Sequence, residues 1–278
     1  MPRFAANLSL MYPELPFLDR FEAAARDGFA GVEYLFPYAF APNELAARLR
    51  AHGLQQALFN LPPGGLTPEA MTRAWEAGER GTACMPGREA EFRAGLTLAL
   101  RYAEALDCPR LHAMVGLRAV STDAREADRC LLNNLRWAAA EAARAGVTLL
   151  IEPINPRSVP GFHLQRQDHA HRLVQELGLP NVQVQMDLFH CQIVEGDLST
   201  KLRQYLPSGW VGHLQIADVP DRHEPGTGEV NWPHLFDLID ELSANDGWSG
   251  WVGCEYTPAD PSPGGTSRGL GWMQKYRP

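Results

Sequence analysis

The sequence lacks the features that mark nucleic-acid-binding and membrane proteins. Its formal net charge at pH 7 is −8, and it contains no stripe of Lys and Arg with interleaved aromatic residues. Nucleic acid is therefore not an expected partner. No uncharged apolar run approaches the roughly 20 residues that span a bilayer, and the start, MPRFAANLSLMYPELPF, has no sustained apolar core behind basic residues. We expect a cytoplasmic protein without a membrane partner.

Cysteine is also scarce, and no two cysteines form a CxxC pair. An odd number of widely spread residues favours reduced thiols in the cytosol over a disulfide framework. We interpret all of them as small buried residues. They are Cys84, Cys108, Cys130, Cys191 and Cys254.

No linker-like stretch divides the 278 residues, of which 45% are hydrophobic and 21% charged, so the chain can bury a large core. Eight apolar segments of strand type alternate with segments of helical period. The strand segments are 3–9, 31–36, 54–61, 110–116, 148–155, 181–190, 211–218 and 251–257. This alternation predicts one (β/α)8 TIM barrel domain over residues 1–278, because closure of a parallel sheet removes its edges. A doubly wound open sheet is the alternative, but no GxGxxG follows the first strand.

Polar side chains stand where four of these strands end. In TLLIEPIN a buried strand runs directly into Glu152, and burying an unpaired carboxylate is costly. Asp187, Gln215 and Glu255 take similar places on the next three strands. If these side chains point inward, their oxygen atoms converge at the C-terminal mouth of the barrel and suit Mg²⁺ or Mn²⁺. Each residue alone also fits a solvated rim position or a helix cap; the joint occurrence favours a metal site.

Other polar residues have simpler interpretations. Cys254 has the opposite strand parity from Glu255, so it should pack against the outer helices. His213 lies one layer deeper than Gln215 and should hydrogen-bond to a site residue rather than bind metal. We interpret His52 and His234 as ordinary surface or helix histidines.

The motifs IEPIN, MDLFH, HLQIAD followed by PGTGEVNW, and GCEY resemble the hydroxypyruvate isomerase family of the xylose-isomerase-like TIM barrels. NLPPGG at 60–65 and the stretch beginning WEAGERGTACMPG at 75 add to the resemblance. It implies a divalent metal held by the four residues Glu152, Asp187, Gln215 and Glu255. It also implies that the two glutamates act as proton donor and acceptor. Related ketose epimerases carry a histidine at the position of Gln215, which favours the isomerase branch.

The predicted reaction moves a carbonyl between adjacent carbons of a small keto acid through an enediolate, for example from hydroxypyruvate to tartronate semialdehyde, or in a 2-oxo-tetronate. It needs a Lewis acid and carboxylates for proton transfer. His190 should contact substrate, and Arg222 should clamp a substrate carboxylate; a solvated loop arginine is the alternative. The loop from Pro62 to Pro86 either folds over the site or is a long surface loop.

Three functions stay open from the sequence. They are a metal-dependent keto-acid isomerase, a metal-dependent sugar isomerase or ketose 3-epimerase, and a barrel that binds such a ligand without turning it over. A DNA-repair nuclease is disfavoured, because more histidine ligands and a basic surface would be expected. A homo-oligomer is compatible with the sequence, which does not specify the oligomeric state.

Overall fold

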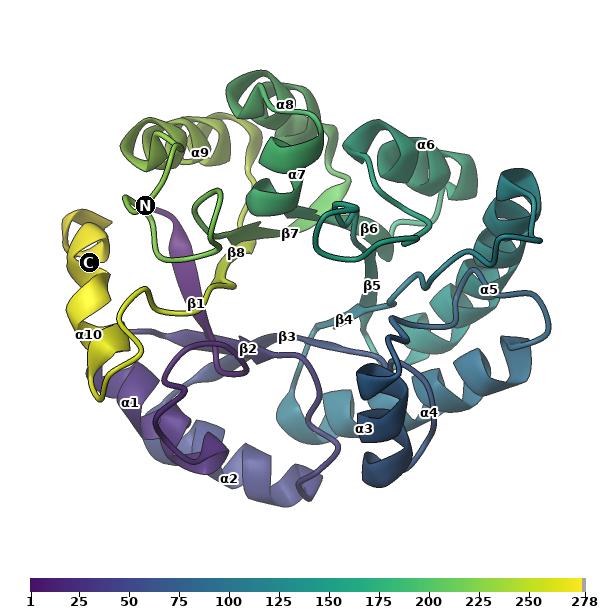
Figure 1. Ribbon diagram of the computed structural model, residues 1–278, viewed down its shortest axis with the longest axis horizontal. Coiled ribbons are helices and arrows are strands. Elements are labelled where there is room, and N and C mark those ends of the chain that lie inside the picture. The colour runs from purple at the N-terminus through teal and green to yellow at the C-terminus, as the bar shows by residue number, and fades with distance from the viewer. Residues whose placement is uncertain (277–278) are drawn as a thin grey trace.

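The computed structural model describes residues 1–276, and its centre is a closed barrel of eight parallel strands in sequence order (Figure 1). The first strand pairs with the last, which closes the sheet. The strands are β1 Arg3–Asn7, β2 Gly31–Tyr34, β3 Gln55–Asn60, β4 Arg110–His112, β5 Thr148–Ile151, β6 Val182–Asp187, β7 Val211–Ile216 and β8 Trp251–Cys254. The predicted TIM barrel is confirmed, and the doubly wound alternative is wrong.

Helices surround the barrel and link successive strands (Figure 1). The α-helices are α1 Arg20–Arg26, α2 Pro42–His52, α3 Pro68–Glu76, α4 Glu89–Leu106, α5 Ala124–Arg144, α6 Gln167–Leu177, α7 Leu188–Val194, α8 Leu198–Tyr205, α9 Trp232–Asp246 and α10 Gly265–Gly269. Short 3-10 helices are η1 Phe17–Asp19, η2 Leu206–Ser208 and η3 Leu270–Tyr276. Between residues 1 and 276 no helix is both long and apolar enough to cross a membrane.

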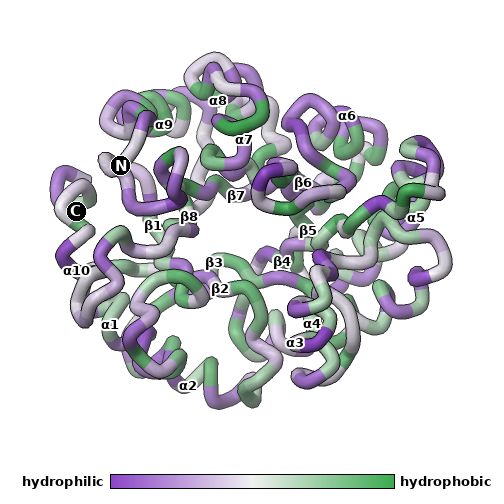
Figure 2. The backbone as a smooth tube through the Cα atoms, viewed as in Figure 1, coloured by the Kyte–Doolittle hydropathy of each residue, from purple (hydrophilic) through white to green (hydrophobic). Residues whose placement is uncertain are grey.

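The helices bury one face each, as their sequence period predicts. Along α4, Phe92, Leu96, Ala99 and Leu106 are all buried. Hydrophobic and hydrophilic residues accordingly alternate along the outer helices in Figure 2. His52 ends α2, and His234 lies exposed in α9, which confirms their interpretation as ordinary helix histidines.

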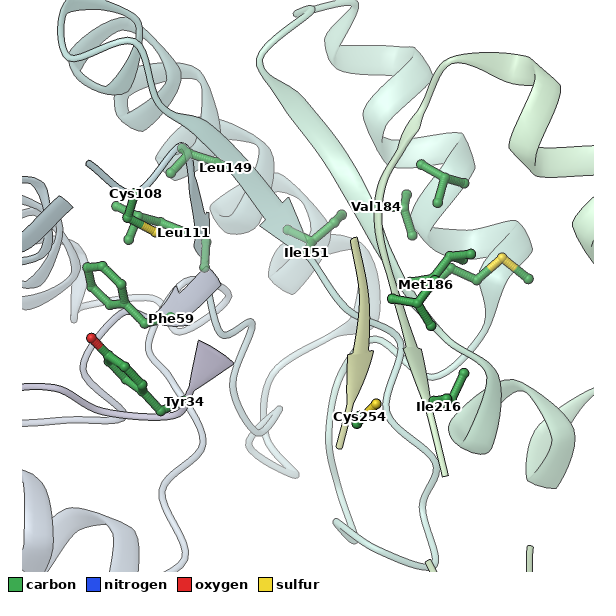
Figure 3. Close-up of a cluster of buried hydrophobic side chains, with 14 of the residues drawn as sticks. Tyr34, Phe59, Cys108, Leu111, Leu149, Ile151, Val184, Met186, Ile216 and Cys254 are labelled. Carbon is green, nitrogen blue, oxygen red and sulfur yellow. The ribbon is translucent and has the colours of Figure 1, made fainter. Parts of the chain in front are cut away.

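The main core lies between the outer face of the barrel and the helices. Figure 3 shows Ile151, Met186, Ile216 and Cys254 among the side chains of this layer. Cys254 therefore packs as its strand parity predicted. All five cysteines are buried and free, which confirms that they are not disulfide partners. Because neighbours along a strand face opposite sides, the residues that follow or precede these four can point into the barrel.

The strands are shorter than several of the predicted segments. β5 ends at Ile151 and β8 at Cys254, so Glu152 and Glu255 are the first residues after their strands rather than the last within them. At the mouth the backbone leaves the sheet, and Glu255 N–H still donates to Ile216 O of β7 at 3.1 Å. Pro153, which has no N–H to donate, contributes to this end of β5.

Candidate active site

The four predicted metal ligands lie buried at the C-terminal mouth of the barrel. Asp187 is the last residue of β6, Gln215 lies near the end of β7, and Glu152 and Glu255 directly follow β5 and β8. A cavity of about 210 Å³ opens here, and its lining includes Glu152, Glu255, His190 and Arg222. Pockets for drug-sized ligands measure roughly 300–1,000 Å³, so this cavity suits a smaller molecule.

Glu152, Asp187 and His190 form the tightest part of the site, with one potential ligand atom of each within 4.8 Å of the others. His190 Nε2 lies 3.7 Å from Glu152 Oε1 and 3.5 Å from Asp187 Oδ2. These two carboxylate oxygens are buried, and neither accepts a hydrogen bond from any residue between 1 and 276. Buried, unpartnered carboxylate oxygens are the donors that a hard divalent cation requires.

The carboxylates strongly disfavour one another's charge. Burial raises the pKa of Glu152 well above its ordinary value, and the negative charges of Glu255 and Asp187 add to the shift. Burial also raises the pKa of Asp187, although Arg222 opposes it. Burial raises the pKa of Glu255 to about 8, again against the effect of Arg222. One arginine does not neutralise three buried carboxylates, so a dication fits the charge of this cluster.

His190 is a neutral hydrogen-bond donor by its contacts. Burial lowers the pKa of its imidazole well below 6.5, and the positive charge of Arg222 contributes. Ser158 donates its backbone N–H to Asn155 Oδ1, which turns Asn155 Nδ2 toward His190 Nδ1 at 2.5 Å. Nδ1 must then accept, so the ring proton sits on Nε2. This tautomer suits a hydrogen bond to a substrate oxygen better than metal ligation.

Gln215 belongs to a buried hydrogen-bond network inside the barrel. Its Oε1 accepts from Gln185 Nε2 at 2.6 Å, and its Nε2 donates to Glu33 Oε1 at 2.7 Å. His213 Nε2 lies 2.6 Å from Glu33 Oε2, and Asn7 donates to Glu33 as well. His213 thus contacts a site carboxylate, as predicted. Gln215 on β7 is the register partner of Asp187 on β6. The hydrogen bonds to Gln185 and Glu33 set the orientation of the Gln215 amide.

Glu33 is a buried site residue that the sequence analysis missed. It lies in β2, and its carboxylate fills the space above Gly253, where any Cβ would clash with it. The signal was present, because GVEYLF carries a glutamate inside an apolar strand segment just as TLLIEPIN does. His112, at the end of β4, was also missed. Burial lowers the pKa of His112 to about 3, and its Nδ1 lies 3.6 Å from Glu152 Oε2.

Arg222 points into the site, so the alternative of a solvated loop arginine is wrong. Its Nη2 lies 2.6 Å from Glu255 Oε2 and 3.6 Å from Asp187 Oδ2, and its guanidinium sits over the ring of Phe189. Its backbone is left-handed, with φ of 61°, an uncommon conformation for a residue other than glycine. The structure therefore pairs Arg222 with the carboxylates of the protein itself.

The segment from Pro62 to Pro86 is not the plain loop we expected, because α3 lies within it. Thr67 caps this helix by accepting from the N–H of Ala70, and a proline occupies the first turn. Thr-Pro before a helical pattern is a start signal that the sequence analysis overlooked. Trp75 in α3 and Arg80 after it line the cavity, so this segment does border the site.

A second group of possible ligands, Asp128, His163 and His169, differs from the first in its bonding. Both histidines lie within 2.9 Å of Asp128 Oδ1, and Arg172 binds Oδ2 of the same carboxylate. The donors of this group are thus satisfied by each other. The arrangement anchors the segment after β5 to α5 and α6.

Comparison with known proteins agrees with this fold. The family model for the xylose isomerase-like TIM barrel matches residues 21–276. The chain is 52% identical to 2-oxo-tetronate isomerase of Cupriavidus necator over 276 residues, 99% of each protein. It is 44% identical to hydroxypyruvate isomerase of Escherichia coli over 277 residues, the whole of both.

Solved structures agree as well. A crystal structure described as AP endonuclease, family 2 from Brucella melitensis covers 100% of both chains, with a TM-score of 0.91 and 47% identity. An L-ribulose 3-epimerase structure, at 20% identity, has a TM-score of 0.70 over 97% of this chain and 86% of its own, and shares the fold.

The chain belongs to the xylose isomerase-like TIM barrel family. Within that family it groups with the hydroxypyruvate and 2-oxo-tetronate isomerases, and it is an enzyme of the isomerase class.

Proposed function

We propose that this enzyme isomerises a small keto acid that carries a neighbouring hydroxyl group. Hydroxypyruvate, converted to tartronate semialdehyde, and a 2-oxo-tetronate are the candidate substrates, as the names of the similar proteins suggest. The single observation that carries the proposal is the set of three buried carboxylates, Glu152, Asp187 and Glu255, gathered at the mouth beside Arg222. The small cavity beside them fits a molecule of three or four carbons.

A divalent ion, Mg²⁺ or Mn²⁺, fits the donors present. Glu152 and Asp187 each offer a buried oxygen that has no hydrogen-bond partner among residues 1–276, and we propose Gln215 and Glu255 as the further ligands that the family resemblance implies. When bound, such an ion supplies Lewis-acid stabilisation of negative charge on the substrate oxygens.

The protein groups carry the proton transfer in this proposal. One glutamate, Glu152 or Glu255, takes a proton from the hydroxyl-bearing carbon, and the other returns a proton to the carbon that held the carbonyl. A hydroxyl proton moves to the former carbonyl oxygen, so no oxidant or reductant is consumed. His190 donates from Nε2 to a substrate oxygen, and Arg222 holds the Glu255 carboxylate at 2.6 Å so that it keeps one orientation.

A substrate panel tests the proposal against its alternatives. The metal-loaded enzyme should isomerise hydroxypyruvate or a 2-oxo-tetronate and show little turnover of neutral ketoses. Chelation should abolish turnover, and Mg²⁺ or Mn²⁺ should restore it. Epimerisation of ketoses at C3 without keto-acid turnover would favour an epimerase. Full activity in chelator, with metal removal confirmed by elemental analysis, would exclude metal dependence, and a lack of turnover with every substrate would favour a binding protein.

A further inference from the structure

Arg80 is a cation in the cavity that no acidic group among residues 1–276 neutralises. It follows α3, and it lines the same cavity as Glu152, Arg222 and Glu255. Its guanidinium lies over the ring of Trp75, with Cζ 3.6 Å from the ring centroid. Trp75 is itself held edge-to-face against Phe36, with ring centroids 5.2 Å apart. The cation therefore has a defined position in the wall of this cavity.

The donors of Arg80 are only partly used. Nη1 donates to the backbone oxygens of Trp75 at 3.0 Å and Glu79 at 2.7 Å. Over residues 1–276, neither Nε nor Nη2 makes a hydrogen bond, and the side chain has no ion pair. The adjacent acid, Glu79, is bound instead by Arg88, whose Nη1 lies 2.6 Å from Glu79 Oε2. An uncompensated arginine in a half-buried position calls for an anion from outside the chain.

The two arginines of the cavity differ in this respect. Arg222 already contacts Glu255 and lies close to Asp187, so an additional carboxylate there would meet two negative charges. Arg80 presents its charge without such neighbours. Stacking on an aromatic face also leaves the N–H groups in the guanidinium plane available, and that planar fork matches a carboxylate.

We propose that Arg80, stacked on Trp75, is the subsite that binds the substrate carboxylate and selects acidic over neutral substrates. The inference rests on the proposed keto-acid isomerase function and adds a substrate orientation to it. The carboxylate lies toward α3, while the keto and hydroxyl oxygens lie toward Glu152 and Asp187. The clamp role that the sequence suggested for Arg222 then passes to Arg80, and Arg222 acts on Glu255.

A purely structural role is the competing explanation, because both Nη1 bonds end on carbonyl groups at or just beyond the C-terminus of α3. The test compares Arg80→Gln with Arg73→Gln, which removes the same charge from an exposed position in α3, the helix that precedes Arg80. Arg80→Lys keeps the charge but loses the planar fork. The ligands are hydroxypyruvate, its neutral counterpart dihydroxyacetone, and glycerate, a carboxylate that cannot isomerise.

Arg80→Gln should raise KM for hydroxypyruvate and Kd for glycerate by about 10- to 100-fold, the usual range for losing charge-assisted hydrogen bonds. Its kcat should stay near that of the wild type, since the lost contact is made in the ground state too. KM for dihydroxyacetone, where turnover is measurable, should not rise. Arg73→Gln should have the wild-type KM for hydroxypyruvate and Kd for glycerate. Both constants of Arg80→Lys should lie between those of the wild type and those of Arg80→Gln.

If Arg80→Gln binds glycerate as tightly as Arg73→Gln does, the inference is overturned, and the role of Arg80 is to bind the carbonyl groups at the end of α3. Equal losses for charged and neutral ligands would overturn it as well. Should Arg80→Gln fail to fold, as seen by circular dichroism, Arg80→Lys decides through its Kd for glycerate, because unchanged affinity there contradicts a bidentate clamp. Glycerate binding needs no catalysis, so a wild-type enzyme without keto-acid turnover would refute the proposed function separately.

Discussion

Glu152 combines two properties that its proposed role, proton transfer beside a bound metal, requires. Its Oε1 is buried and accepts no hydrogen bond from residues 1–276, while its Oε2 faces His112 at 3.6 Å. Burial and the charges of Glu255 and Asp187 raise its pKa. A metal lowers the basicity of a bound carboxylate, but charge stabilisation on the substrate acidifies the C–H bond to be broken. Binding and proton transfer by this side chain can therefore be separated by substitution.

Glu152→Gln should keep an oxygen for the metal and lose the basic carboxylate. We expect kcat to fall by about 10²- to 10⁴-fold, the usual contribution of general acid–base catalysis, with metal still bound. Glu255→Gln should behave alike, and kinetics together with metal titration measure both effects. Exchange of substrate protons with solvent deuterium tells which step is lost. Near wild-type rates in both metal-loaded variants would leave the two glutamates as ligands only.

At the scale of secondary structure, one residue joins α7 to the site. Asp187 ends β6 and is also the N-cap of α7, where its Oδ1 accepts from the N–H groups of Phe189 and His190. Its other oxygen, Oδ2, accepts no hydrogen bond from the part of the chain that the structure describes. The helix therefore fixes the carboxylate that faces the site and at the same time positions His190 one turn further along.

Two substitutions at Asp187 distinguish its contribution as the N-cap of α7 from the contribution of its negative charge. Asparagine and alanine both remove the negative charge, but asparagine is as good an N-cap as aspartate. Asp187→Asn should be more stable than Asp187→Ala by about 0.5–2 kcal/mol, measured by urea denaturation in chelator. Both variants should bind metal much more weakly than the wild type. Equal stability of the two would mean that the cap contributes nothing to α7.

At the scale of the whole molecule, the buried carboxylates make the stability of the fold depend on pH, and the proposed metal would change that dependence. A carboxyl group whose pKa is raised in the folded state binds more protons there than in the unfolded chain. Its stabilising contribution is full below the unfolded pKa and is lost as the pH rises through the folded pKa. For Glu255 that window runs from 4.5 to about 8.

The free energy of unfolding of the metal-free wild type should therefore decrease as the pH rises from 4.5 to about 8. That of Glu255→Gln should decrease less over the same interval. Urea denaturation in chelator at several pH values measures both slopes. Saturating Mg²⁺ or Mn²⁺ should stabilise the wild type most at the upper end of the window, because the metal binds the ionised carboxylates. Parallel slopes for wild type and variant would show that Glu255 does not titrate in this range.

Local patterns in the sequence were sufficient to predict the barrel. Alternation of apolar strand segments with stripes such as Phe92, Leu96 and Ala99 is a property of neighbouring residues, and a parallel sheet of eight such units can bury both faces only by closing or by doubly wound packing. Glu152, Asp187 and Glu255 were identified for the same reason, because each is a carboxylate at the end of an apolar strand. Their burial at one mouth follows from the fold.

Contacts between residues far apart in the chain were decided by the tertiary structure alone. Glu33 reaches Gln215 across 182 positions because β2 and β7 meet inside the closed barrel. Arg222 pairs with Glu255, whereas Arg80 in the same cavity has no ion pair among residues 1–276, since charge pairing depends on which loops lie together. Strand period and helix caps act within a few residues and are visible in the sequence, whereas side-chain partners across the barrel depend on closure, register and loop paths, which no local pattern encodes.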